Sequence, residues 1–251
     1  MRQWFRQLGW QPFVPAASVL VVLSLAWAWG RWGGPVGVGG RTVALPVLTA
    51  GWRFLMLVVA TGAAIFATAN LRGTLSVQRG FVAVAALADA CGLLLLLAWW
   101  NGSTLSLADV LRLYLVLSGW LSAVAALTAL LKRFGSGPAV ALAGFIAAIL
   151  LAAPVTLLPV VRAFNGPSQQ HAVTLLTHAC PSLAFLSAVK TPPPLGWSQM
   201  GEMYHLTTLG QDIPMELPQW WAAGLGYSYF AIAVLLLGRL ERKSSKRQSV
   251  G

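Results

Sequence analysis

Long apolar runs separated by short polar stretches dominate the pattern of this chain. Each run is 16–24 residues long, which suits a helix that crosses about 30 Å of hydrocarbon. Pro154 and Pro159 interrupt the fifth run and are expected to kink it. The pattern predicts an all-α, polytopic membrane protein with six transmembrane helices, at residues 14–29, 48–69, 81–100, 108–131, 139–161 and 220–238.

The segments that flank the runs complete a single transmembrane domain over residues 1–251. In residues 1–13, Trp4, Phe5 and Leu8 share one helical face among arginines and glutamines, which predicts a short helix lying in the headgroup plane. Residues 239–251 form a basic tail. At the start of the fourth run, a serine at position 103 or 106 is placed to cap the helix, and an aspartate at 109 favours its N-terminus.

A long connection, residues 163–219, separates the fifth and sixth runs. Its first half, residues 168–189, is apolar on one side and contains Pro181, which predicts a broken helix on or near the membrane surface. A second short helix is expected over residues 197–209. So much apolar content in a connection predicts that it folds against the bundle or a partner.

Composition and charge agree with a membrane location. The chain is 57% hydrophobic and 9% charged, whereas soluble domains carry about 25% charged residues. The net charge of +11 comes from basic residues near the ends of the apolar runs, so it indicates topology and lipid contact rather than nucleic-acid binding. With the N-terminus in the cytoplasm, eleven basic residues fall inside and six outside.

This bias predicts a multi-pass protein of the cell inner membrane with both termini cytoplasmic and residues 163–219 extracytoplasmic. Tryptophans support the same orientation, because they favour membrane–water interfaces. Eight of them are expected at the outer interface: Trp27, Trp29, Trp32, Trp52, Trp99, Trp100, Trp220 and Trp221.

Asp89 is the acidic residue that lies deep within a predicted span. A carboxylate inside a membrane is costly and therefore a functional candidate. It could pair with an arginine such as Arg53 or hold a proton. The alternative is a structural hydrogen bond inside the bundle.

The three histidines, His171, His178 and His205, all lie in the long connection. His171 and His178 are seven residues apart, or about 10 Å along a helix, so they are not adjacent ligands for one metal ion. Cys180 lies nearby, but no spacing typical of zinc sites is present. No metal site, nucleotide motif, haem ligand pair or catalytic constellation is predicted, and no cofactor is expected to bind this chain directly.

A short motif follows the second run, at Arg72, Gly73, Thr74 and Leu75. With the six-span layout, the N-terminal interfacial helix and the long outer connection, it resembles the permease subunits of ABC-2 type transporters. The resemblance implies a cytoplasmic ATPase subunit that binds ATP and a second permease subunit, in a homo- or hetero-oligomer. It also implies that the segment from Arg72 to Arg79 contacts the ATPase.

Three hypotheses follow. The first is a permease subunit of an ABC-type transporter, without catalytic activity of its own. The second is an accessory or structural subunit of a larger electron-transfer or photosynthetic membrane complex, because few charges and many tryptophans suit burial against partners. The third is a membrane enzyme, which requires Asp89 or the three histidines to converge.

Overall fold

The computed structural model describes residues 13–32, 37–38, 41–42, 45–70, 76–101, 105–189 and 217–248. Long helices dominate this part of the chain: α2 (Val14–Trp32), α3 (Leu45–Asn70), α4 (Ser76–Trp100), α5 (Leu107–Leu131), α6 (Ser136–Leu151) and α12 (Trp220–Gln248). Shorter helices are η1 (Lys132–Phe134), α7 (Ala153–Thr156), α8 (Leu158–Arg162), α9 (Pro167–Ala179) and α10 (Pro181–Ser187). The strands β1 (Gly37–Val38) and β2 (Arg41–Thr42) pair as a small antiparallel hairpin.

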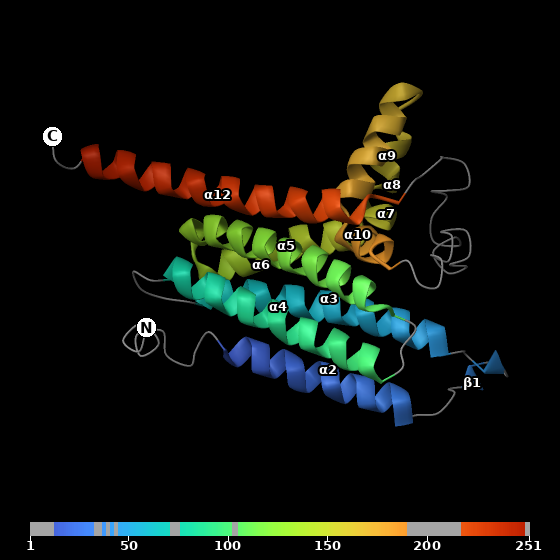
Figure 1. Ribbon diagram of the computed structural model, residues 1–251. Coiled ribbons are helices and arrows are strands. Elements are labelled where there is room, and N and C mark those ends of the chain that lie inside the picture. Colours follow the sequence, from blue (N-terminus) through green and yellow to red (C-terminus); the bar gives the residue numbers. More distant parts are fainter. Residues whose placement is uncertain are drawn as a thin grey trace.

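Consecutive long helices run in alternating directions and form one bundle (Figure 1). α5 lies at its centre and packs against α3, α4, α6 and α12. α2 packs against α3 and α4, on the side of the bundle away from α12. Because α5 is surrounded, its inward side chains are mostly small or aliphatic and fully buried, among them Leu113, Val116, Leu117 and Leu121.

Five of the six tryptophans whose side chains are described lie near one end of the bundle, called here the tryptophan end, and the sixth, Trp120, lies within α5. α2 and α4 end there, and α3, α5 and α12 begin there (Figure 1). The described tryptophans at these helix ends are Trp52, Trp99, Trp100, Trp220 and Trp221. The side chains of the three tryptophans in the last part of α2 lie outside the described residues. The arrangement of the other five agrees with the one-sided belt expected from the sequence.

Four helices are long and apolar enough to cross a membrane, at Trp52–Asn70, Arg79–Trp100, Leu107–Phe134 and Trp220–Leu237. They correspond to the second, third, fourth and sixth predicted spans. The first span coincides with the 19 residues of α2, of which the apolar stretch Val14–Leu25 is described with its side chains. The structure thus confirms an all-helical protein with four helices of membrane-spanning length and composition.

The predicted fifth span, residues 139–161, is not one helix. α6 has 16 residues, which extend over about 24 Å at 1.5 Å per residue, less than the hydrocarbon thickness of about 30 Å. Pro154 has no backbone N–H, and its ring would clash with the carbonyl of Leu150, so the helix breaks at Ala152 and resumes as α7. Pro159 lies in the first turn of α8 in the same way. Two breaks therefore replace the expected kink.

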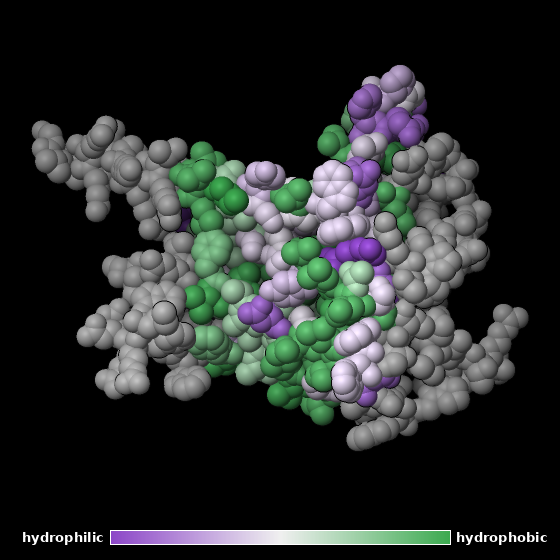
Figure 2. Space-filling view, viewed as in Figure 1, coloured by the Kyte–Doolittle hydropathy of each residue, from purple (hydrophilic) through white to green (hydrophobic). Residues whose placement is uncertain are grey.

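The first half of the long connection is a broken helix, as predicted. α9 ends at Ala179, and the next residue, Cys180, has an extended backbone because the helical region is disfavoured for a residue that precedes a proline. Pro181 then begins α10. α10 packs against α5 and α12, whereas α9 projects from the bundle (Figure 1). Figure 2 shows that hydrophilic side chains gather over the projecting α9 and that hydrophobic ones extend along the bundle.

Some predicted elements lie outside the described residues, namely the interfacial helix at 1–13 and the short helix at 197–209. α12 continues ten residues beyond the predicted end of the sixth span at Gly238 and reaches Gln248. Between these positions the chain has no proline or glycine to stop a helix. The first part of the basic tail is therefore helical.

The contact between α5 and α12 depends on small residues. A Cβ atom added at Gly119 would lie 2.7 Å from the carbonyl oxygen of Gly224 and 3.2 Å from Oγ of Ser228. Further along the same interface, Ala126 packs with Ala231 and Val234. In lipid there is little hydrophobic gain from bringing two apolar helices together, so close backbone approach and van der Waals packing supply the association.

Gly119→Ala is expected to lower the free energy of unfolding by about 1–3 kcal/mol, because the new methyl group pushes α12 away from α5. Thermal unfolding of the purified protein in mild detergent measures this as a lower Tm. Gly226→Ala on α12 is the matched control, since a Cβ atom there meets nothing within 4 Å. Equal Tm values for the two variants would contradict the tight contact.

Candidate functional site

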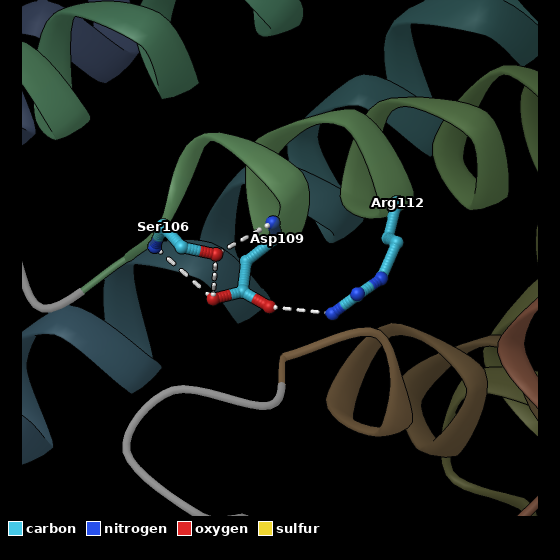
Figure 3. Close-up of polar contacts among 3 residues, drawn as sticks. All are labelled: Ser106, Asp109 and Arg112. Atoms are coloured by element: carbon cyan, nitrogen blue, oxygen red, sulfur yellow. Dashed lines mark hydrogen bonds and ion pairs between the residues drawn. The ribbon is translucent and has the colours of Figure 1, made fainter.

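A cluster of polar side chains lies where α5 begins, at the tryptophan end. The Ser106 hydroxyl accepts a hydrogen bond from the backbone N–H of Asp109 at 3.1 Å, and the Ser106 backbone N–H donates to Asp109 Oδ2 at 3.0 Å. The Ser106 hydroxyl also donates to Oδ2 at 2.7 Å (Figure 3). This reciprocal capping box satisfies N–H groups that the first helical turn leaves unpaired. The predicted cap and the role of Asp109 are confirmed.

Two cations balance the charge of Asp109, which is fully buried. Arg112 donates from Nη1 to Asp109 Oδ1 at 3.0 Å (Figure 3). Arg53, from α3, is attracted electrostatically to the same carboxylate. The sequence prediction counted Arg112 only as an orientation signal and considered Arg53 as a partner for Asp89, not for Asp109. The spacing of three residues between Asp109 and Arg112 was the available sign of an ion pair on one helix face.

The two described histidines lie on the exposed side of α9. Nδ1 of His171 lies 2.7 Å from the carbonyl oxygen of Pro167, and Nδ1 of His178 lies 2.8 Å from that of Thr174. A carbonyl oxygen only accepts, so each Nδ1 carries the proton. His205 lies outside the described residues. Among the described residues there is no group of three histidine, cysteine or acidic side chains that could hold a metal ion.

A small hollow lies between α9 and the start of α12. Its volume is about 170 Å³, below the range of about 300–1,000 Å³ that is usual for small-molecule sites. Its size suits water or a small polar group. The residues that line it are Gln170, Val173, Thr174, Thr177, His178, Leu217 and Gln219.

The end of α9 is tied to the bundle through Tyr227 on α12. The Tyr227 hydroxyl lies 3.3 Å from the carbonyl oxygen of His178 and 3.4 Å from that of Ala179, to which it donates. Its ring meets Trp120 of α5 edge-on, with the ring centroids 5.4 Å apart. Cys180, the next residue along, is fully buried. Burial raises the pKa of its thiol, because the thiolate would lose its hydration.

Asp89 lies on the exposed side of α4, not in the bundle interior. The Tyr114 hydroxyl of α5 donates to Asp89 Oδ1 at 2.7 Å. The suggested pairing with Arg53 is not found, because Arg53 is attracted to Asp109 instead. The structure therefore contains the expected hydrogen bond, but on the outer surface of the bundle.

The predicted ATPase-coupling residues divide into two groups. Arg72, Gly73, Thr74 and Leu75 lie outside the described residues. Arg79 is the fourth residue of α4, at the end of the bundle opposite the tryptophan end, and is partly buried. These placements leave the coupling role a prediction.

The described residues do not bring an acid–base pair together. Asp89 accepts from Tyr114, the two histidines donate to the backbone of α9, and Asp109 is held between arginines and a helix cap. The convergence that a membrane enzyme requires is therefore not found among them. Comparison with protein-family models, curated proteins and solved structures gave no match to this chain.

Asp109→Asn is expected to lower the free energy of unfolding by about 1–3 kcal/mol, because Arg53 and Arg112 lose their shared countercharge at a buried site. Arg112→Gln is the comparison variant. Its effect should be smaller, since the Arg112 side chain is 25% exposed and the capping box and Arg53 remain. Thermal or denaturant unfolding in detergent measures both, and a larger loss in Arg112→Gln would contradict the central role of Asp109.

Cys180 should resist maleimide labelling in the folded protein and react after denaturation. Its raised pKa keeps the thiol protonated as the pH rises through the ordinary thiol value of about 8.5, so native labelling should stay slow there. Measurements in a Cys91→Ala background isolate this thiol. Thr174→Cys in a Cys91→Ala, Cys180→Ala background is the control, because position 174 is exposed on α9, the helix that precedes Cys180. Equal rates at the two positions would show that Cys180 is accessible.

Proposed function

We propose that this protein is a membrane-spanning permease subunit of an ABC-type transporter. It works in the cell inner membrane with a separate cytoplasmic ATPase subunit and a second permease subunit. In this proposal the chain crosses the membrane six times. α2 makes the first crossing, and the broken segment α6–α8 makes the fifth. Both termini are cytoplasmic, and the connection at residues 163–219 is extracytoplasmic.

The direction of the helices supports this topology. The first residues of α2 and the last residues of α12 lie at the same end of the bundle, opposite the tryptophan end (Figure 1). α6 runs from that end toward the tryptophan end, and α7 to α10 follow there. An even number of crossings accounts for both observations. It also agrees with the excess of basic residues on the proposed cytoplasmic side.

The closed interior of the bundle is the observation that carries the need for a second permease subunit. Apart from Asp109 at the beginning of α5, the buried side chains of the described long helices are apolar or carry hydroxyl groups that are hydrogen-bonded to the backbone. A polar path through the middle of this single bundle is therefore absent from the described residues. Transport by such a subunit requires a path at an interface between two subunits, with α9 and α10 at its outer mouth.

The coupling surface in this proposal lies at the opposite end of the bundle. Residues 1–13 and the segment from Arg72 to Arg79 receive the motion of the ATPase there. Lys132 and Arg133, after α5, lie at the same end, and Lys132 donates to the carbonyl oxygen of Thr68 at 3.4 Å. ATP binds to the partner subunit in this scheme.

The second candidate function is an accessory or structural subunit of a larger electron-transfer or photosynthetic complex. The closed interior also favours this function, because a purely structural subunit needs no path. Its wide exposed apolar surface, which includes Phe145, Leu175 and Phe230, suits either lipid or neighbouring subunits. The two functions differ in whether the partners bind ATP or carry pigments and redox groups.

Extraction in mild detergent through a C-terminal tag, followed by mass spectrometry and an absorption spectrum, tests the proposal. We expect an ATP-binding subunit in a colourless eluate. A coloured eluate with redox subunits would instead establish the accessory function. Recovery of this chain without an ATP-binding subunit would overturn the transporter proposal.

Substitution of both Arg72 and Arg79 by serine is expected to reduce recovery of the ATP-binding subunit by about tenfold, which corresponds to about 1.4 kcal/mol. Arg133→Ser is the control variant at the same end of the bundle, because Arg133 is exposed and lies over the Phe134 ring, 5.0 Å from its centroid. An equal loss in both variants would indicate a general charge effect instead of a specific contact.

A further inference from the structure

Asp89 lies at the centre of an apolar membrane-spanning stretch. It is the eleventh residue of Arg79–Trp100, which has 22 residues, so it lies about 15 Å from either end. The side chains at steps of four along the same side of α4 are exposed and otherwise apolar. We call this surface the Asp89 face: Phe81, Ala85, Asp89, Leu93 and Leu97.

The position of Asp89 on this face is held by α5. Tyr114 donates the one hydrogen bond that reaches the Asp89 carboxylate among the described residues. The Tyr114 ring lies over Gly92, where a Cβ atom would come within 2.9 Å of Tyr114 Cδ2. A glycine at this position therefore makes the space that lets the ring reach Asp89. The hydrogen bond from Tyr114 reaches Oδ1, so Oδ2 of the carboxylate is left for an external partner.

The described part of this chain supplies no cation to Asp89. Arg112 is two residues from Tyr114 on α5. Residues that are two positions apart point to nearly opposite sides of a helix, and Arg112 pairs with Asp109. Arg79 is ten residues away on α4, about 15 Å along the axis. An ionisable side chain in a membrane span normally faces a protein interior or a water-filled cavity and pairs there. Asp89 instead faces the outside of its own bundle. A protein environment around this carboxylate would therefore have to come from another subunit.

We propose that the Asp89 face binds a transmembrane helix of a different protein, and that this helix carries a lysine or arginine at mid-bilayer depth. Charge complementarity identifies the occupant. A second copy of this chain placed symmetrically on the face would bring Asp89 against Asp89, and two like charges in hydrocarbon repel. A cationic side chain neutralises the carboxylate, and the flanking Phe81, Ala85, Leu93 and Leu97 pack against the rest of the helix.

This inference requires only that α4 spans the membrane. It does not depend on ATP-driven transport, so the outcome of the co-purification experiment leaves it untouched. If the second permease subunit is a different chain, the inference also states what one of its helices must carry.

The test uses the full chain in phosphatidylcholine vesicles and two synthetic leucine–alanine helices of about 20 residues. One helix has a single central lysine and the other has leucine there. Energy transfer between labels on the protein and on the peptide measures association. The lysine peptide should bind about tenfold more tightly, as expected for a polar contact between helices of about 1–2 kcal/mol.

Asp89→Asn should abolish the preference for lysine, whereas Phe145→Ala should keep it, because Phe145 is exposed on α6 and is not part of the Asp89 face. Asp89→Lys should bind a peptide with a central aspartate more tightly than the leucine peptide. This charge reversal shows that a loss of binding in Asp89→Asn is not caused by misfolding. Equal binding of the two original peptides, or a lysine preference that survives Asp89→Asn, would overturn the proposal. Self-association of differently labelled copies that is lost in Asp89→Asn would also overturn it, by making a second copy the occupant.

Discussion

The absence of water from hydrocarbon makes each polar group in this bundle depend on a protein partner. The buried hydroxyls meet this demand locally: Thr61, Thr68 and Thr128 donate to the carbonyl oxygens of the residues four positions earlier, at 2.6, 2.8 and 2.8 Å. Trp120 then donates from Nε1 to the Thr61 hydroxyl at 2.8 Å and links α5 to α3. With its polar groups satisfied, α5 can be surrounded by other helices, and its small residues admit α12 at close range.

The same constraint separates the two intramembrane acids. Asp109 lies at the beginning of α5, where free N–H groups, a serine cap and arginines stabilise a buried negative charge. Asp89 lies in the middle of α4, where the helix backbone has no free donors, and Tyr114 is the residue in the described part of the chain that donates to it. The first acid is thus part of the architecture of the tryptophan end. The second, Asp89, has no countercharge from the described part of its own chain.

These two features support the proposal that partner subunits complete the function of this protein. The interior of the described bundle is filled, so a transport path or a redox chain needs a surface shared with another subunit. The polar α9 and its small hollow with His178 lie at one end. Lys132 and Arg133, which follow α5, lie at the other. A permease that couples an ATPase on one side to an outer mouth on the other uses both ends.

The sequence by itself determined that the apolar runs are helices suited to lipid, and it determined most of the positions where these helices begin and end. Runs of apolar residues have few other stable structures in lipid, and Ser106 and Pro181 mark local ends that depend only on neighbouring residues. Tertiary structure decided the rest. Whether Pro154 kinks or breaks a helix depends on what packs beside it, and Arg53 is attracted to Asp109 because α3 packs against α5. Hydropathy placed Asp89 at mid-membrane, but hydropathy does not tell whether the side chain faces the bundle interior or the outside. Only the packing of α4 against α2, α3 and α5 turned that carboxylate outward.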